Sequence, residues 1–178
     1  MLKKILRFVL ILAIVVIGGG FLMPGTSHVE RQTDINAPAA VVFDQLNELK
    51  NWNNWSPWAK LDPNVKMTYS QPSSAGIGAF YTWASQQSNV GEGKMTILDA
   101  KPNELLHYRM DFKGANEAFA DFRLTAKDST STHLVWTFDT DHGLNPISRW
   151  FGLMFEKLIA PDYEKGLATL KSNLEKTH

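Results

Sequence analysis

The chain opens with its most continuous apolar run. Lys3, Lys4 and Arg7 precede residues 8–23, in which no side chain is charged or forms a hydrogen bond. In a bilayer, a helix of roughly 20 such residues satisfies its own backbone groups and crosses the hydrocarbon. The pattern predicts an N-terminal transmembrane helix as a membrane anchor over residues 1–23, followed by a short linker at residues 24–28.

A secretory signal peptide has a similar basic start and apolar middle, but it ends in a small-x-small cleavage site. Here the run ends in bulky residues up to Met23, and the pair Gly18 and Gly20 lies inside it. An uncleaved anchor is therefore favoured, with a cleaved signal peptide as the alternative. The positive-inside rule predicts a single-pass topology with the N-terminus in the cytoplasm and the domain extracytoplasmic, on the periplasmic side in a Gram-negative cell.

Beyond the linker, the periodicity changes from extended to helical and back. Residues 28–35 read as a strand, and Asn36-Ala37-Pro38 then supplies the chemistry of a helix start. Val42, Leu46 and Leu49 mark one face of that helix. Residues 52–58 are irregular or form a short second helix. The first strand is therefore expected to lead directly into a helical pair.

Six short runs of β-branched and aromatic residues follow, separated by turn residues. They are residues 65–69, 79–84, 93–98, 105–112, 118–125 and 133–139. In the fourth run, Leu106 and Tyr108 alternate with His107 and Arg109, which predicts a dry and a wet face. Together with the first strand, these runs predict an antiparallel sheet of about seven strands.

The last segment returns to helical spacing. Asn145 is placed to cap the helix with Pro146 at its first position, and an apolar stripe runs from Ile147 to Leu158. Pro161 is expected to kink or restart the helix, and the stripe then continues to Leu174. A one-sided sheet and a long apolar-striped helix bury their surfaces best when the sheet curves around the helix. The predicted fold class is α+β.

Composition narrows the class of partners. The anchor region holds three of the 18 Lys and Arg residues and none of the 18 acidic ones, which leaves a net charge of −3 on the remainder. A mildly acidic domain without basic clusters is a poor match for nucleic acid, so no nucleic-acid partner is expected. About 150 residues remain for one domain. The absence of cysteine excludes disulfides and thiolate chemistry.

A search for catalytic and metal-binding patterns yields no catalytic set. The five histidines have no H-x-x-x-H spacing, and no G-x-S-x-G elbow occurs, so no metal, cofactor or catalytic residue is assigned. Ligands brought together by folding stay possible. Asp111, Asp121, Arg109 and Arg123 lie on predicted wet faces and are expected to form solvated charge pairs.

The order of elements and several short motifs resemble a known superfamily. The motifs are Ile35-Asn36-Ala37-Pro38, Trp52-x-x-Trp55-Ser56-Pro57-Trp58, Gly76-x-Gly78-Ala79 and Gly166-Leu167-x-x-Leu170-Lys171. They are similar to those of the START-like, SRPBCC or Bet v 1-like helix-grip superfamily, and most of all to bacterial polyketide cyclase-type proteins. The resemblance covers residues 29–178. It implies a ligand-binding domain with a hydrophobic cavity between sheet and helix, but it identifies function poorly.

Large aromatic and methionine side chains are the remaining signal for a site, because they offer rigid apolar surfaces to a ligand. Core building explains them equally well. The candidate cavity-lining residues are Trp55, Trp58, Tyr81, Trp83, Tyr108, Met110, Phe122, Trp136, Met154 and Leu158. Trp55 and Trp58 have a third interpretation, contact with a bilayer interface.

Three functions from different classes follow. The favoured one is non-catalytic binding of a hydrophobic small molecule or lipid in the cavity, by a membrane-anchored domain. The second is a polyketide cyclase- or dehydratase-like enzyme, in which Tyr81, Tyr108, Arg109 or His107 would point inward. The third is a structural or interaction module with a filled core. The volume left inside the fold discriminates between them.

Overall fold

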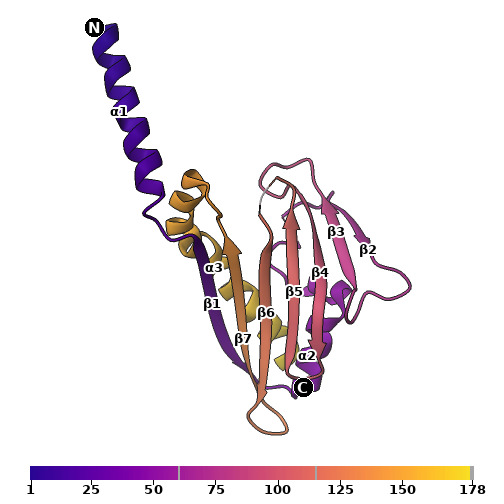
Figure 1. Cartoon of the computed structure of the whole chain (residues 1–178). Coiled ribbons are helices and arrows are strands. Elements are labelled where there is room, and N and C mark those ends of the chain that lie inside the picture. The colour runs from indigo at the N-terminus through magenta and orange to yellow at the C-terminus, as the bar shows by residue number, and fades with distance from the viewer. Residues whose placement is uncertain (60, 115, 177–178) are drawn as a thin grey trace.

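The computed structural model describes residues 1–59, 61–114 and 116–176. An N-terminal helix stands apart from a curved sheet, and a second long helix lies against that sheet (Figure 1). In chain order the elements are α1 (Leu2–Gly20), β1 (Thr26–Ile35), α2 (Ala39–Asn47), the 3-10 helix η1 (Leu49–Asn54), β2 (Lys66–Tyr69), β3 (Phe80–Ala84), β4 (Glu92–Lys101), β5 (Leu105–Phe112), β6 (Ala118–Ala126), β7 (Thr132–Asp141) and α3 (Pro146–Glu175). The predicted order of strand, helical pair, six strands and long helix is confirmed.

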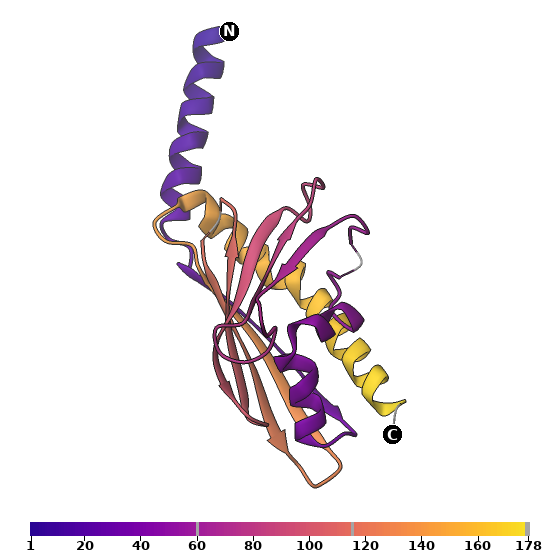
Figure 2. The same ribbon diagram turned by 90° about the vertical axis from the view of Figure 1, so that its right-hand side faces the viewer.

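All seven strands form one antiparallel sheet in the order β1-β7-β6-β5-β4-β3-β2. Strands β2 to β7 follow one another as a meander, and β1 joins β7 at the far edge. A register shift between Ile97 and Asp99 in β4 bends the sheet locally. The sheet curves so that one face is concave and is covered by α2, η1 and α3 (Figure 2). This arrangement is the predicted helix grip.

The alternation predicted for the strands is confirmed. In β5, Leu106 and Tyr108 are buried, while His107 and Arg109 on the opposite face are partly exposed. Trp136 of β7 and Phe122 of β6 are fully buried beside them on the concave face. Because successive side chains of a strand point to opposite faces, the apolar core collects between the concave face and the helices.

Helix α3 begins where the sequence predicts. The Asn145 side chain accepts hydrogen bonds from the backbone amides of Ile147 and Ser148, and Pro146 occupies the first position. The helix continues through Pro161 to Glu175 without a restart. Arg31 of β1 donates to Glu164 at 2.8 Å and to Glu156 at 3.3 Å, which fixes one side of α3 along the β1 edge of the sheet.

The predicted membrane anchor is wrong. Among the described residues, none of the helices is both long enough and apolar enough to cross a membrane. The three cations lie within α1 (Leu2–Gly20), and the uncharged part after Arg7 is only about 20 Å long at about 1.5 Å per residue, against about 30 Å of hydrocarbon. The finding overturns the single-pass topology, and with it the placement of the N-terminus in the cytoplasm and of the domain on the other side.

The end of α1 packs against the start of α3. Trp150 Nε1 donates to the Val16 carbonyl at 2.8 Å, and a Cβ at Gly19 would lie 2.9 Å from the Trp150 ring. A Cβ at Gly20 would lie 2.5 Å from Pro146. The two glycines therefore allow a close approach between the helices that larger residues would prevent. Strand β1 begins at Thr26, inside the range predicted as a linker.

Candidate ligand-binding site

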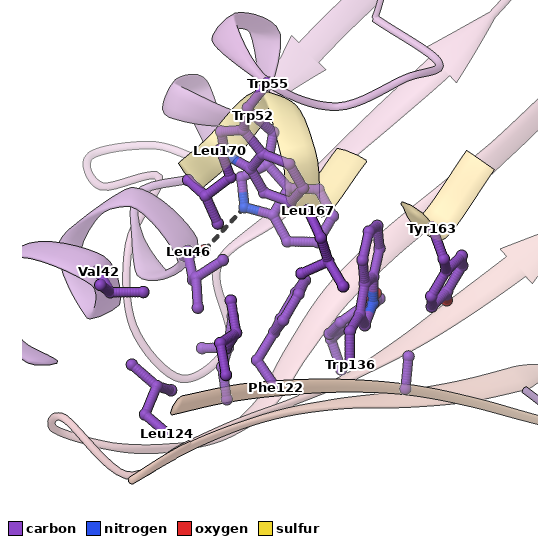
Figure 3. Close-up of a cluster of buried hydrophobic side chains, with 14 of the residues drawn as sticks. Val42, Leu46, Trp52, Trp55, Phe122, Leu124, Trp136, Tyr163, Leu167 and Leu170 are labelled. Atoms are coloured by element: carbon purple, nitrogen blue, oxygen red, sulfur yellow. Dashed lines mark hydrogen bonds between the residues drawn. The ribbon is translucent and has the colours of Figure 1, made fainter. Parts of the chain in front are cut away.

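The inner half of the space between sheet and helix is filled by aromatic rings. Trp136 of β7 and Tyr163 of α3 stack with ring centroids 3.8 Å apart (Figure 3). Trp58 packs edge-on against both rings, at 5.9 Å and 6.0 Å. We call Trp58, Tyr108, Trp136 and Tyr163 the plug, because they occupy the part of the interior where the resemblance predicts a cavity.

A hydrogen bond joins two members of the plug. Trp136 Nε1 donates to Tyr108 Oη at 2.8 Å. Burial raises the pKa of the Tyr108 and Tyr163 phenols above the ordinary value for tyrosine, so both stay protonated at neutral pH. Tyr108, Trp136 and Tyr163 are at most 1% exposed and their rings are packed in the interior, so these three side chains are a fixed part of the core.

Towards the other end of the sheet the concave face is less covered. Tyr81 and Trp83 of β3 and Met110 of β5 are half-buried, and Phe112 is 36% exposed. The Trp83 ring lies against Gly93, where a Cβ would come within 2.3 Å of it, and it meets Phe112 edge-on at 5.6 Å. Cross-strand pairing places Met95 between Tyr81 and Met110. Met95 is fully buried, whereas Tyr81, Trp83, Met110 and Phe112 form an apolar wall that solvent reaches.

The facing wall comes from the first half of α3. Phe151, Met154 and Leu158 are 65%, 55% and 58% exposed. At about 3.6 residues per turn, Phe151 and Leu158 lie on the same side of the helix as Asn173. Asn173 donates to the Asn54 carbonyl, so that side of α3 meets η1 in its last turns.

The same side of the helix is open to solvent in the first turns of α3. The Phe155 ring stacks on Phe138 of β7 at 5.3 Å, so Phe151 and Leu158 border the concave face rather than the β1 edge. Met154 lies about 180° around the helix from Tyr163 and points away from the sheet. We call the space between Phe151 and Leu158 on the helix and the side chains of Tyr81, Trp83, Met110 and Phe112 the mouth.

A groove with a volume of about 420 Å³ lies at the rim of this region, at the ends of β3, β4 and β5. It is lined by Thr82, Trp83, Ala84, Glu92, Gly93, Lys94, Asp111, Phe112 and Lys113. Lys113 pairs with Glu92 at 3.0 Å across the rim. The groove combines an apolar part, Trp83 and Phe112, with charged side chains of both signs.

The charged side chains of the middle strands face away from this interior. His107 Nδ1 bonds Asp121 at 2.5 Å, Arg123 bonds Asp121 at 2.7 Å, and Arg109 bonds Asp111. The expectation of charge pairs on the wet faces is confirmed. The enzyme hypothesis would have His107 or Arg109 point into the interior. Both side chains lie on the opposite face of the sheet and do not reach it. In the described part of the chain, no three His, Asp or Glu side chains are grouped so that they could hold a metal ion.

The structure distributes the candidate residues over three places. Trp55, Trp58, Tyr108, Phe122 and Trp136 lie together in the filled inner half, and Tyr81, Trp83 and Met110 lie on the sheet wall of the mouth. Leu158 lies on its helix wall, whereas Met154 is exposed on the side of α3 that points away from the sheet. Tyr163, Phe112 and Phe151 were not among the candidates. The helical period places Tyr163 on the buried stripe with Leu167 and Leu170, but no sequence pattern identifies its stacking partner.

Comparisons with known proteins agree with this architecture. A family model described as "Polyketide cyclase / dehydrase and lipid transport" matches residues 26–175. A search of curated proteins gave no match.

Three solved structures illustrate the fold. The chain resembles the ZhuI aromatase/cyclase from Streptomyces sp. R1128 (18% identity, TM-score 0.61, 85% of this chain and 94% of that one). It also resembles a protein from Thermobifida fusca (18%, 0.64, 84% and 93%) and protein SA2116 of unknown function from Staphylococcus aureus (9%, 0.63, 85% and 96%). At these identities the likeness concerns the fold alone.

Proposed function

Because this chain belongs to the polyketide cyclase, dehydrase and lipid transport family, we propose that it binds a hydrophobic small molecule or lipid, and that the ligand occupies the mouth. The proposal is supported by one observation above all. An apolar wall from β3 and β5 borders the groove at the strand ends, and Phe151 and Leu158 lie on the side of α3 that meets η1; both surfaces are accessible to solvent.

The physical reason is that apolar surface left in water is unfavourable in free energy, and a bound ligand would cover it. Phe151 and Leu158 each leave more than half of their surface in water, where a packed core would cover them. A contiguous exposed apolar surface of this kind is typical of ligand-binding grooves and interaction sites. A ligand that filled the mouth would remove both walls from water, at about 25 cal/mol per Å² of apolar surface buried.

A fluorescence titration of the full chain with 1-N-phenylnaphthylamine, without detergent, tests the proposal. The dye brightens in apolar sites, so the wild type should give a saturable rise. Leu158→Glu places a charge on the helix wall, and we expect it to weaken binding by about tenfold, or about 1.4 kcal/mol. No saturable binding, or equal binding by Leu158→Glu, would count against the mouth as the site.

Two matched controls distinguish the mouth from other exposed apolar surface. Ile77 is 67% exposed and lies before β3, at the end of the sheet opposite the mouth, so Ile77→Glu should leave the affinity unchanged. Leu10 is 60% exposed on α1, and Leu10→Glu should also bind the dye as the wild type does. If Leu10→Glu alone lost binding, the dye would be reporting on α1.

A cyclase- or dehydratase-type reaction is the second candidate, favoured by the family description. Tyr81 is an ionisable side chain on the sheet wall of the mouth. Burial raises its pKa above the ordinary value, which keeps the phenol neutral and able to donate a hydrogen bond. Tyr81→Phe separates the two candidates, since it should leave dye binding intact while abolishing any turnover that depends on the hydroxyl.

A further inference from the structure

We infer that α1 docks with the same helix of a second copy of this chain, and that the two helices lie antiparallel. The contact surface is the side of α1 that faces away from α3, which we call the free side. Since α1 takes no part in the mouth, the inference does not rest on the proposed function.

The rest of the chain leaves most of the apolar surface of α1 uncovered. Twelve of its large apolar side chains are at least 41% exposed. Val16 is the least exposed of them, because α3 meets α1 only at Val16, Gly19 and Gly20. A helix that is apolar on all sides is normally covered by other protein or by lipid. The exposed surface therefore requires a partner outside this chain.

The free side is defined by residues that share one angular position on the helix. At about 100° per residue, four residues fall within about 60° of one another, opposite the contact with α3. They are Arg7, Ile11, Ile14 and Gly18. Ile11 and Ile14 are 61% and 62% exposed, and a Cβ at Gly18 would have no atom within 4 Å.

The spacing of these four residues is the same in both directions along the helix. Successive members are four, three and four positions apart. An antiparallel second helix therefore places Arg7 beside Gly18 of the other copy, and Ile11 beside Ile14. The long Arg7 side chain lies over the open space at Gly18, and the isoleucines form an apolar centre. Such a pair is closed by a two-fold axis and adds no further copies through this surface.

Charge favours the antiparallel orientation over the parallel one. The three cations of α1 lie in its first two turns, near the positive end of the helix dipole, and its last turn carries no basic residue. A parallel pair would bring six cations together. An antiparallel pair places each set beside the negative end of the other helix. Arg149 of α3 reaches the Phe21 carbonyl at this end, whereas the free side at Gly18 is open.

The area is sufficient for a dimer. A large apolar side chain that is about half exposed presents about 100 Å² to water, so covering half of the twelve in both copies would bury about 1,200 Å² in total. Specific interfaces between proteins begin at about this size. Helix α1 stands clear of the curved sheet, which leaves room for a second helix along it (Figure 1).

Sedimentation equilibrium of the full chain without detergent, over a range of concentrations, tests the inference. The wild type should reach a plateau at twice the mass of one chain. Ile14→Lys places two additional cations at the centre of the pair, close to Arg7 of each copy, and should weaken the dimer at least tenfold. Ile11→Lys should act in the same way and keeps the test available if Ile14→Lys does not fold, which thermal unfolding shows.

Ile77→Lys is the matched control, because Ile77 is 67% exposed and lies outside α1. Its mass should equal that of the wild type at every concentration. A monomeric wild type, a mass that rises without a plateau, or two α1 variants that dimerise as the wild type does would each overturn the inference.

Cross-linking tests the orientation, and the absence of native cysteine makes it specific. Arg7→Cys and Gly18→Cys are treated with a short bis-maleimide, separately and after mixing. In the antiparallel pair, equivalent cysteines lie about 16 Å apart along the helix, so a cross-linked dimer should form in the mixture only. Cross-linking of each variant by itself would indicate a parallel pair and would overturn the arrangement.

Lipid is the other possible cover for α1, and flotation with vesicles of phosphatidylcholine and phosphatidylglycerol tests it. A wild type that is monomeric in solution and floats with these vesicles overturns the inference, because lipid would then cover the helix in place of a second copy. None of these outcomes depends on dye binding at the mouth, so failure of the proposed function is detected separately.

Discussion

Tyr163, on the final helix, lies face to face with Trp136 of the last strand, with 3.8 Å between ring centroids and 25° between ring planes. The two residues are the closest aromatic contact between α3 and the sheet, and they divide the interior. On one side of them the core is filled by Trp52, Trp55 and Phe122. On the other side lies the mouth. The energetics of this contact therefore bear on both stability and binding.

A double-mutant cycle should detect the contact directly. Trp136→Leu and Tyr163→Leu each remove a buried ring, and each should lower the free energy of unfolding by about 2–5 kcal/mol. The double variant should lose less than the sum of the two, by about 0.5–1.5 kcal/mol, because the second substitution removes a ring that has already lost its partner. Urea unfolding measures all four proteins. Strict additivity would contradict the stacking contact.

Gly166 should resist substitution although it lies inside a helix. Alanine usually stabilises a helix interior by about 1 kcal/mol relative to glycine. Here the new Cβ would press on the Trp136 ring and on Pro57, so Gly166→Ala should lower the unfolding midpoint instead. Gly18 in α1 has open space around it and serves as the matched control. Gly18→Ala should raise the helical circular dichroism signal without lowering the midpoint.

Gly93→Ala should disturb the mouth from the sheet side. The Cβ would come within 2.3 Å of the Trp83 ring and 2.7 Å of the Asp111 carbonyl, so the ring must leave the strand surface. We expect a loss of about 1–3 kcal/mol of stability and weaker binding of 1-N-phenylnaphthylamine. In a Trp83→Leu background, Gly93→Ala should lower the stability by a smaller amount, because the Trp83 ring no longer obstructs the new Cβ. An equal cost in both backgrounds would show that the Trp83 ring is not what the methyl group meets.

Acid should weaken the β6–β7 turn through Asp128. Hydrogen bonds from Ser131 and from Thr130 lower the pKa of Asp128 to about 2. A depressed folded-state pKa means that the carboxylate stabilises the protein above the unfolded value of about 4, and that this contribution is lost as the pH falls from about 4 to about 2.

Thermal unfolding across that range checks the prediction. Asp128→Asn should be less stable than the wild type at neutral pH, and the difference should shrink as the pH approaches 2. A difference that is constant over the whole range would show that the stabilisation does not depend on the charge of Asp128.

Much of the fold could be predicted from the sequence, because the features concerned are local. Alternation in β5 follows from the two-residue period of a strand, and the start of α3 follows from the cap chemistry of Asn145 and Pro146. The same local reasoning was wrong for α1. The apolar run of residues 8–23 reads as a membrane span, but the structure places the three cations inside the helix and ends it at Gly20, packed against Pro146.

The candidate site was predicted as a set of residue types, and only the tertiary structure sorted that set. Trp55 and Met154 are both large apolar residues in the sequence, yet one is 2% exposed in the core and the other is 55% exposed on the outer side of α3. Burial depends on which segments far apart in the chain come together, and no local pattern contains that information. The sequence by itself thus determined the elements, their order and the apolar faces, since these depend on neighbouring residues. The tertiary structure decided that Trp136 meets Tyr163 and closes the interior halfway, because that contact joins residues from a strand and a helix whose relative position only the folded chain sets.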